Sequence, residues 1–326
     1  MNPFEYVAPS DLAEASTLLS NRWGDSEILA GGTDLITSLK QGITHPRRLV
    51  SLRNIPELKR IQVKKNTVRI GAMVTLKELA ANETVQAEFP SLVTAIHGIG
   101  SSQIINQGTI AGDLCQRPRC WYYRNGFGLL GEENGESLIR SGDNRYHAIF
   151  GNGGRALFVN ASSLAPALIA LQSEIIVTGP NGLEREIDAS ELFTTPANGD
   201  AREVSLRANE IISEIKIPRE DMQNATYEIR HRHGLDWPYV SASVALKIRS
   251  GIARDASVIL GHVAPTPWNA VAASNLLNGV RMDNALAEAA GAAASRGATP
   301  LSDNGYKVQM VKTAVKRALL AAAAND

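Results

Sequence analysis

The chain is poor in the features that mark several common classes of protein. It has two cysteines in 326 residues, too few for the disulfide framework of a small secreted domain. Its 33 Lys and Arg residues balance its 33 Asp and Glu residues, so the net charge gives no general attraction for nucleic acid or an acidic membrane. No run approaches the ~20 apolar residues that cross a bilayer. We therefore expect no nucleic-acid partner and no membrane span.

The N-terminus and the cysteine content both bear on location. The segment from Met1 to Glu5 has no basic stretch followed by an apolar one, so we expect no signal peptide. Two cysteines in a chain of this length suit a reducing compartment. The sequence therefore predicts a cytoplasmic protein.

Familiar catalytic and nucleotide-binding motifs are missing as well. A G-x-G-x-x-G pattern begins at Gly98 but fails at Gln103, and the P-loop, G-x-S-x-G and H-E-x-x-H motifs are absent. His231 and His233 would share one face of a strand, but no third ligand is evident. A Rossmann dehydrogenase, a P-loop enzyme, an α/β-hydrolase and a metal site all lose support.

What is present is the pattern of a folded, multidomain chain. Hydrophobic residues make up 44% and charged residues 20%, values typical of globular proteins. Strands and helices alternate over the first ~55 residues, and the apolar periodicity becomes a strand run followed by Ala-rich helices near the C-terminus. The main predicted helices are 11–20, 75–81, 91–97, 163–171, 284–296 and 308–324, and the main predicted strands are 26–30, 48–52, 61–74 as a hairpin, 174–178, 210–218, 227–229, 240–248 and 256–263.

Two loops containing glycine could hold a phosphate group. In the first, a predicted strand leads through two glycines into a helix that Thr33 or Asp34 can cap, so free N–H groups would face an anion such as a pyrophosphate. The second adds another run of backbone donors and the Thr109 hydroxyl. Either loop alone could also be an ordinary turn, whereas the pair suggests a dinucleotide that straddles both. The two loops comprise Leu29, Ala30, Gly31, Gly32, Thr33, Asp34, Leu35 and Ile36, and Thr109, Ile110, Ala111, Gly112 and Asp113.

Six short motifs, in order along nearly the whole chain, resemble those of the FAD-binding medium subunit of molybdenum hydroxylases. This is the family of xanthine dehydrogenase, carbon monoxide dehydrogenase and aldehyde oxidoreductase. The motifs are Pro3-Phe4-Glu5-Tyr6, Ala30-Gly31-Gly32-Thr33-Asp34-Leu35, Thr109-Ile110-Ala111-Gly112-Asp113, Ser162-Ser163-Leu164-Ala165-Pro166-Ala167-Leu168, Glu210-Ile211-Ile212-Ser213-Glu214-Ile215-Lys216-Ile217-Pro218 and Val263-Ala264-Pro265-Thr266-Pro267.

The resemblance implies an α+β fold with three parts. Two α/β subdomains, at 1–58 and 59–218, would form an FAD-binding domain of the vanillyl-alcohol-oxidase or PCMH type. An α+β C-terminal domain, with an antiparallel sheet and helices, would occupy 219–326. An irregular insertion at about 115–155 would interrupt the second subdomain.

The resemblance also implies roles for individual residues. The two glycine loops would hold the FAD pyrophosphate, Ser163 and Leu206 would lie near the flavin, and Ile99 matches another apolar contact position. Three features depart from the family pattern: Ala111 replaces a usual glycine, Ser163 replaces an acid, and the segment 227–230 is one residue short of a Lys-containing motif. Arg230 or Arg232 could replace that lysine.

The segment from Leu114 to Arg124 resembles an insertion that carries a [4Fe–4S] cluster in some relatives. Such a cluster normally needs four thiolates, and this chain has only Cys115 and Cys120. His147 is a poor substitute for the missing ligands. We therefore expect no cluster and no metal in this chain.

The implied function is an oxidoreductase subunit of a heterotrimer. It would bind FAD and pass electrons from the [2Fe–2S] clusters of a small subunit to an external acceptor, such as NAD or oxygen. A large molybdopterin-binding subunit would oxidise the substrate, and no side chain of this chain would act as a catalytic group. The alternatives are a non-catalytic assembly subunit with weakened FAD binding and a stand-alone FAD-dependent NAD(P)H reductase. Export of the folded complex on a partner's signal is the alternative to a cytoplasmic location.

Overall fold

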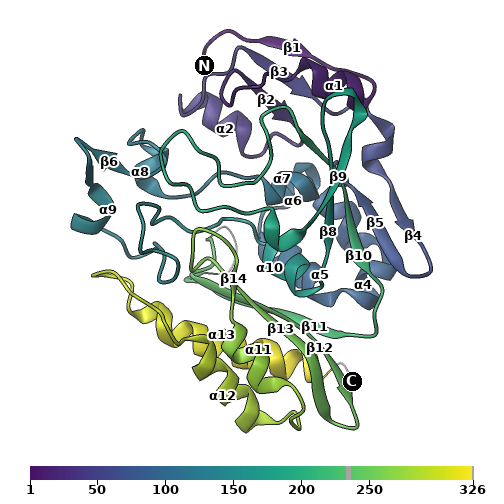
Figure 1. Ribbon diagram of the computed structural model, residues 1–326, viewed down its shortest axis with the longest axis vertical. Helices are drawn as coiled ribbons and strands as arrows, with labels where there is room; N and C mark the ends of the chain where they lie inside the picture. Colours follow the sequence, from purple (N-terminus) through teal and green to yellow (C-terminus); the bar gives the residue numbers. More distant parts are fainter. Residues whose placement is uncertain (233–235, 325–326) are drawn as a thin grey trace.

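In the computed structural model, which describes residues 1–232 and 236–324, three large β-sheets follow one another from the N-terminus to the C-terminus (Figure 1). Helices cover each sheet, and a small two-stranded ribbon lies in the insertion at the side of the molecule. The predicted α+β class is confirmed. Within the described residues, no helix combines the length and the apolar content needed to span a bilayer.

The first sheet is parallel, with the strand order β1-β3-β2. Parallel neighbours need crossover connections, and the helices α1 and α2 lie in the connections that the chain makes here. The Asp11 carboxylate caps α1 by accepting a hydrogen bond from the Glu14 N–H at 2.8 Å. The elements are β1 (Glu5–Val7), α1 (Leu12–Leu18), β2 (Ser26–Leu29), α2 (Leu35–Lys40) and β3 (Arg48–Ser51).

The second sheet is antiparallel and has the order β4-β5-β10-β8-β9. Its central strand, β10, comes last in the chain, so the sheet is completed only when residues 211–218 pair with both β5 and β8. The strands are β4 (Ile61–Val63), β5 (Thr67–Gly71), β8 (Glu174–Thr178), β9 (Glu184–Asp188) and β10 (Ile211–Pro218), accompanied by short 3-10 turns at Pro56–Lys59, Pro180–Gly182 and Ala189–Glu191.

Short helices pack beside the second sheet, and two of them lie where the sequence shows little periodicity. In that region, Ser101 and Thr109 accept hydrogen bonds from the N–H groups of Ile104 and Gly112 and so cap two helices of five or six residues. Helices this short display barely more than one turn of apolar pattern. The helices are α3 (Leu76–Ala81), α4 (Glu83–Glu88), α5 (Pro90–Gly98), α6 (Ser102–Gln107), α7 (Ile110–Leu114) and α10 (Ala165–Ala170).

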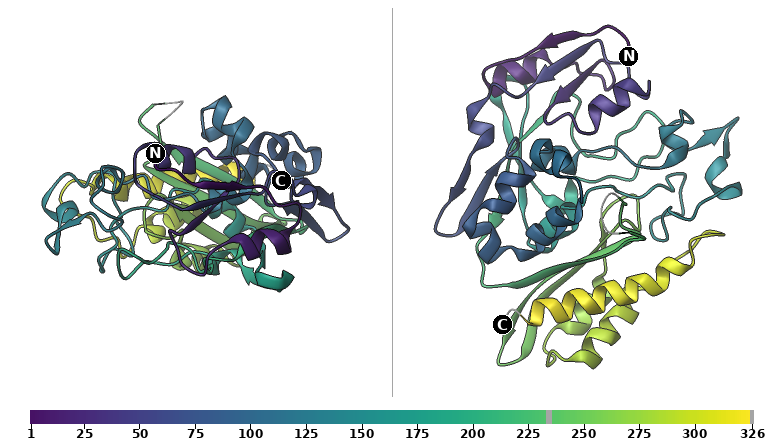
Figure 2. Two further views of the ribbon diagram at one scale, coloured as in Figure 1. Left: turned by 90° about the horizontal axis from the view of Figure 1, so that it is seen from above. Right: turned by 180° about the vertical axis from the view of Figure 1, so that it is seen from behind.

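The third sheet, with the order β11-β12-β13-β14, is antiparallel, and α12 and α13 lie against it (Figure 2). The change from strands to Ala-rich helices that the sequence shows is therefore confirmed. The elements are β11 (Gln223–Ile229), β12 (Val240–Arg249), β13 (Ile252–Gly261), β14 (Trp268–Asn269), α11 (Val271–Leu277), α12 (Asn284–Ala294) and α13 (Tyr306–Ala323).

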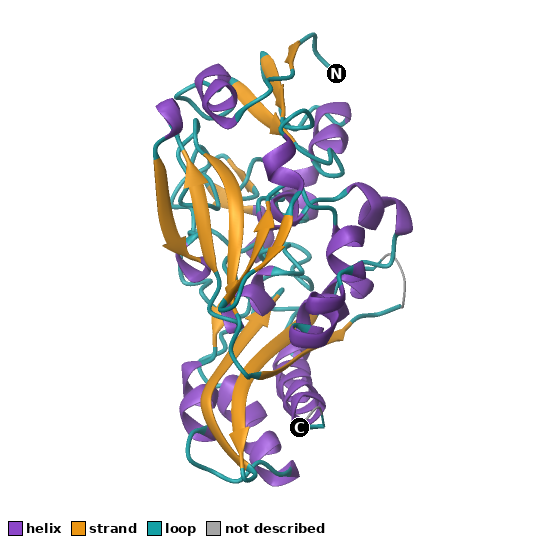
Figure 3. Cartoon of the chain, turned by 90° about the vertical axis from the view of Figure 1, so that its right-hand side faces the viewer, coloured by secondary structure: helices purple, strands orange, loops and turns teal. Residues whose placement is uncertain are grey.

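The buried apolar side chains form two large cores. The first is continuous from the parallel sheet into the five-stranded sheet and includes Val50, Ile70 and Ile215. The second lies between the third sheet and its helices and includes Leu260 and Val315. Figure 3 shows the five-stranded and four-stranded sheets one above the other. The first two sheets thus share one core, whereas the C-terminal region has its own.

The insertion projects from the side of the molecule (Figure 1) and has little regular structure, as the sequence predicts. A small apolar cluster that contains Tyr123, Leu129 and Phe158 holds it together. Its elements are α8 (Trp121–Arg124), β6 (Glu132–Glu133), β7 (Glu136–Ser137) and α9 (Leu138–Ser141).

Lys307, at the start of α13, joins the insertion to the C-terminal domain. Its Nζ donates hydrogen bonds to the backbone carbonyl oxygens of Tyr146, His147 and His262, at 3.0 to 3.1 Å. The side chain is buried, and this burial lowers the pKa of Lys307 to about 7. Asn304 also donates to the carbonyl of His147. Asn304 and Lys307, just before and at the start of α13, therefore hold the end of the insertion, at Tyr146 and His147, and Lys307 also holds the distant residue His262.

The close packing of α12 on α13 predicts that Gly291→Ala destabilises the chain by about 1–3 kcal/mol through overpacking. A Cβ at Gly291 would lie 2.4 Å from the backbone carbonyl oxygen of Lys312. Alanine favours a helix over glycine by about 1 kcal/mol. A lower free energy of unfolding would therefore show that the packing clash dominates, and a higher one that helix propensity dominates. Urea unfolding is the measurement, and Gly305→Ala, where a Cβ meets open space, is the control. A stabilised Gly291→Ala would contradict the packing seen here.

The burial of His262 predicts an acid-sensitive contribution to stability. Burial, reinforced by the charge of Lys307, lowers the pKa of His262 to about 3. The ordinary pKa of histidine is about 6.5. At a pH between 6.5 and 3, His262 therefore binds a proton in the unfolded chain but not in the folded one, so the free energy of unfolding decreases as the pH falls.

We compare the free energies of unfolding of the wild type and of His262→Asn. We expect the value for the wild type, relative to the variant, to fall by about 1.4 kcal/mol per pH unit as the pH falls from 6.5 toward 4. The asparagine can still bond the Ser241 hydroxyl, which lies 3.2 Å from the His262 Nδ1 atom. Chemical unfolding at a series of pH values measures the difference. His97→Asn, at an exposed position, is the control. Parallel pH profiles for wild type and His262→Asn would contradict this account.

Candidate functional site

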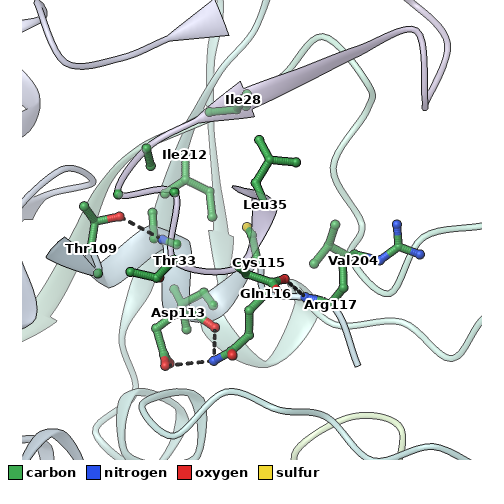
Figure 4. A pocket seen from close by; sticks show the side chains of 18 of the residues that line it. Ile28, Thr33, Leu35, Thr109, Asp113, Cys115, Gln116, Arg117, Val204 and Ile212 are labelled. Atoms are coloured by element: carbon green, nitrogen blue, oxygen red, sulfur yellow. Dashed lines mark hydrogen bonds between the residues drawn. The ribbon is translucent and has the colours of Figure 1, made fainter. Parts of the chain in front are cut away.

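A deep cleft lies where the first sheet, the second sheet and the loop before β12 meet, and both glycine loops line it (Figure 4). Of the predicted site residues, Leu29, Ile36 and Ile110 do not line the cleft. Leu29 ends the strand β2, and Ile110 is completely buried. The predicted residues that do line it are Ala30, Gly31, Gly32, Thr33, Asp34, Leu35, Thr109, Ala111, Gly112, Asp113, Ser163 and Leu206.

The first glycine loop offers several unused backbone donors. Among the described residues, the N–H groups from Gly31 to Asp34 make no hydrogen bond within the chain. Gly32 has a φ of +76°, a left-handed conformation that glycine adopts without strain and that turns the chain from β2 toward α2. A row of free N–H groups on a bend of this kind suits a phosphate or pyrophosphate.

Gly31 lets the two glycine loops touch. A Cβ at this position would lie 1.9 Å from the backbone carbonyl oxygen of Gln107 and 3.2 Å from the Cα atom of Gly108. No side chain fits between the two backbones. Glycine at position 31 therefore sets the width of the cleft at this point.

The second glycine loop corrects part of the expectation, because its backbone donors are already used. The N–H groups of Ile110 and Ala111 donate to the backbone carbonyls of Val74 and Ala72, at 3.0 and 3.3 Å. The Gly112 N–H donates to the Thr109 hydroxyl oxygen at 3.2 Å. The predicted run of free backbone donors in this loop is therefore wrong. The Thr109 hydroxyl keeps its own hydrogen to donate.

Asp113 holds the second loop against the segment that contains Ser163. Its carboxylate accepts hydrogen bonds from the Ser162 hydroxyl at 2.5 Å and the Leu164 N–H at 3.1 Å, and the Gln116 amide donates to its other oxygen at 2.9 Å (Figure 4). Burial raises the pKa of Asp113, while the bonds from Ser162 and Leu164 oppose the rise. The side chain thus positions two walls of the cleft.

Asp34 holds the insertion onto the first loop. Its carboxylate accepts a hydrogen bond from the Arg117 N–H at 2.8 Å and forms ion pairs with Arg119 at 3.0 Å and Arg124 at 2.9 Å. Asp34 occupies the position before α2 but makes no side-chain cap there, so the predicted capping role for it is wrong. The guanidinium groups of Arg119 and Arg124 and the backbone N–H of Arg117 occupy the carboxylate instead, and the two charge-assisted bonds are stronger than a neutral cap.

One end of the cleft is basic and aromatic, and the sequence indicated this end only in part. Arg230 lines it and bonds the Gly98 carbonyl oxygen and the Glu228 carboxylate. Arg232, the other residue considered for this role, does not line the cleft and pairs with Asp236 at 2.9 Å. In the sequence, this end of the cleft was indicated only by the Gly-Ile-Gly segment at 98–100, and Ile99 does line the cleft.

The opposite end is formed by an ion pair and an indole. Arg202 pairs with Glu27 at 2.6 Å and lies over the Trp23 ring, with its guanidinium carbon 4.8 Å from the ring centre. All three residues line the cleft. No motif in the sequence pointed to them, because 175 residues separate the two charged partners.

The two cysteines lie in different surroundings. Cys115 faces the cleft, and its thiol pKa is raised by the enclosing walls and by the nearby carboxylates of Asp113 and Glu203. Cys120 lies outside the cleft, with its sulfur 3.2 Å from the His147 Nε2 atom. In the described parts of the chain, no three His, Cys, Asp or Glu residues are grouped to hold a metal ion; His233 lies outside the described residues.

Comparison with protein families agrees with this geometry. Residues 2–220 match the family described as "FAD binding domain in molybdopterin dehydrogenase", and residues 225–322 match "CO dehydrogenase flavoprotein C-terminal domain". The first match contains the lining residues of the cleft up to Ile212, and the second begins at residue 225, within β11.

Individual relatives match over most of their length. The chain is 29% identical over 327 residues to the carbon monoxide dehydrogenase medium chain of Hydrogenophaga pseudoflava, covering 98% of this chain and 96% of the relative. It is also 29% identical over 282 residues to the aldehyde oxidoreductase FAD-binding subunit PaoB of Escherichia coli (strain K12), with 85% and 87% covered.

A solved structure shows the same architecture. The structure of carbon monoxide dehydrogenase from Hydrogenophaga pseudoflava, in a form that lacks the Mo-pyranopterin moiety of its cofactor, superposes with a TM-score of 0.78. The match has 28% sequence identity and covers 99% of this chain and 98% of the matched chain.

The contacts of Asp34 predict that Asp34→Asn loosens the insertion. Asparagine keeps the shape but loses the charge that holds Arg119 and Arg124, so we expect a loss of about 1.5–3 kcal/mol in local stability. Limited trypsin digestion is the measurement, with faster cleavage after these two arginines. Asp143→Asn, which breaks an exposed ion pair with Arg145 in the same insertion, is the control. Equal cleavage rates in both variants would show that Asp34 does not hold the insertion.

Proposed function

Because the chain belongs to the family of FAD-binding medium subunits of molybdenum hydroxylases, we propose that it receives electrons from [2Fe–2S] clusters of a small partner subunit and passes them to an external acceptor. A large molybdopterin-binding subunit would complete the heterotrimer and oxidise the substrate. The name "medium chain" of the carbon monoxide dehydrogenase relative supports an assembly with a smaller and a larger chain.

The observation that carries the proposal is the row of free N–H groups from Gly31 to Asp34, in a cleft that the matched FAD-binding region forms. A pyrophosphate carries the negative charge that such a row binds best. The nearby Gly31 lets the backbone of the second loop close against the first. The residues present therefore fit the central part of FAD.

We assign the two ends of the cleft from their chemistry. The end with Gly98, Ile99, Arg230 and Trp237 would receive the flavin ring, where an apolar side chain and an indole provide packing surfaces and Arg230 provides positive charge. Ser163 and Leu206 line the same cleft. The end with Trp23 would receive the adenine, because an indole face packs well against a flat base.

Bound flavin would supply the redox chemistry, taking up electrons singly or in pairs. The chain's own residues bind and orient it. The first loop would hold the pyrophosphate, Asp113 keeps the second loop and the Ser163 segment in register, and Asp34 keeps the insertion over the cleft. No side chain is required as a nucleophile or a general acid.

Purification of the chain, followed by a visible spectrum and an FAD titration, tests this function. We expect a yellow protein with the absorption bands of bound flavin. A colourless chain that does not take up FAD would support the assembly-subunit alternative. Reduction of the isolated chain by NADH, without partner subunits, would support a stand-alone reductase.

Gly31→Ala tests directly whether the first glycine loop binds FAD. We expect FAD binding to weaken about tenfold or more, because a backbone clash of this kind costs about 1–3 kcal/mol. Gly153→Ala, where a Cβ meets open space outside the cleft, is the matched control. Circular dichroism checks that both variants are folded. Unchanged affinity in a folded Gly31→Ala protein would remove the first loop from the site.

A further inference from the structure

A buried carboxyl group, that of Glu228 in β11, lies next to the end of the cleft assigned to the flavin ring. Its side chain is 8% exposed and does not line the cleft. The Oε2 atom accepts a hydrogen bond from Arg230, which does line the cleft. The Oε1 atom is buried and has no hydrogen-bond partner among the described residues. A buried carboxylate needs several bonds to replace the water it loses, so the negative charge of Glu228 is poorly compensated.

The chain leaves a space for this carboxyl group at the end of α5. A Cβ atom at Gly98, the last residue of α5, would overlap the Glu228 Oε2 atom and lie 2.9 Å from the Arg230 Nη2 atom. Arg230 also donates a hydrogen bond to the Gly98 carbonyl oxygen. The carboxyl and guanidinium groups therefore fill the room that a side chain at position 98 would take. They lie where the FAD-binding region meets the C-terminal domain.

The Arg230 guanidinium is shared between this carboxyl group and the cleft. Its side chain is 9% exposed, so little water screens its charge from that of Glu228. When Glu228 is ionised, the two opposite charges largely cancel. When Glu228 is protonated, the positive charge of Arg230 is no longer balanced by its nearest carboxyl group. The charge that a flavin ring would meet at this end therefore depends on a single proton.

Glu228 changes its charge near neutral pH. Burial raises the pKa of its carboxyl group to about 7, against the opposing charge of Arg230 and with an addition from Asp113 in α7. The other charged or titratable groups around the pair are held in one state. Asp113 accepts several hydrogen bonds that favour its ionised form, and the Asp236 carboxylate has an arginine partner of its own. His262 stays neutral, because its pKa is lowered to about 3.

We propose that Glu228 is a positioning residue that acts on the flavin through Arg230, by taking up a proton when the flavin is reduced and releasing it when the flavin is reoxidised. This role rests on the proposed function, because it requires FAD in the cleft. Electrons added to the ring favour positive charge beside it. Arg230 supplies most of that charge when Glu228 is neutral. The electrons come from the partner's [2Fe–2S] clusters, and the proton comes from water and forms one O–H bond on Glu228.

The reduction potential of bound FAD at pH 6 and pH 8 tests the proposal. It is measured by spectroelectrochemical titration of the full chain, for the wild type and for Glu228→Gln. Glutamine keeps an oxygen that accepts from Arg230, but it cannot ionise. Between pH 6 and pH 8, we expect the wild-type equilibrium for reduction to weaken about tenfold more than that of the variant, which is about 30 mV for a two-electron couple. Equal pH dependence in the two proteins would overturn the proposal.

Glu88→Gln is the matched control. Glu88, in α4, also pairs with an arginine, Arg219, but neither residue lines the cleft. We expect this variant to keep the pH dependence of the wild type. If Glu88→Gln altered it as much as Glu228→Gln does, the effect would come from the net charge of the chain, and the role of Glu228 would be wrong.

Infrared difference spectra between the oxidised and reduced chain give a second measurement that does not need a folded glutamine variant. On reduction near pH 8, the wild type should gain the C=O band of a protonated carboxyl group. Glu228→Asp, which still titrates, should shift this band, and Glu228→Gln should lack it. A wild type without the band, or a band that neither substitution changes, would exclude Glu228 as the proton acceptor.

These results distinguish a failure of this inference from a failure of the proposed function. A chain that takes up FAD but shows the same potentials with and without the Glu228 carboxyl group would overturn the inference alone. A folded chain that takes up no FAD would overturn both, because it would hold no flavin for Glu228 to act on.

Discussion

The contact between two stretches of backbone, at Gly31 and at Gln107 to Gly108, is the constraint on which the cleft depends. The first stretch leaves the parallel sheet and the second connects α6 to α7, so the contact joins the first two sheets at one point. Because no side chain can stand between them, the distance between the loops cannot be adjusted by substitution. The free N–H groups of the first loop are thereby kept beside the second loop, although the two are far apart in the sequence.

Around this contact, carboxylates act mainly as anchors for neighbouring loops. Asp34 binds a backbone N–H and two guanidinium groups of the insertion, and Asp113 binds a hydroxyl and a backbone N–H from the segment before α10. Both are largely buried, so each loses much of its hydration and recovers it through charge-assisted bonds. A cleft whose walls are tied in this way is largely preorganised, and a ligand that enters it needs to order little of the chain.

The sequence allowed most of the longer elements and the two loops of the cleft to be predicted, but it revealed neither the short helices α6 and α7 nor how the backbone donors of the loops are used. The glycine loop at 31–32 could be recognised because residue type alone implies close backbone approach. The second loop looked equivalent, yet its donors are taken by the carbonyl oxygens of Ala72 and Val74. Main-chain acceptors carry no residue-type signal, so a pairing of this kind can be seen only in three dimensions.

The hydrogen bonds of Lys307 bear on the order in which the chain becomes structured. The lysine bonds a carbonyl 161 residues earlier in the chain, at Tyr146, and another at His262. During synthesis, the insertion therefore leaves the ribosome long before the helix that secures it exists. Closing so long a loop is entropically costly and slow. The docking of α13 is thus a late event, and until then the aromatic residues around Tyr146 remain accessible to chaperones and to premature association.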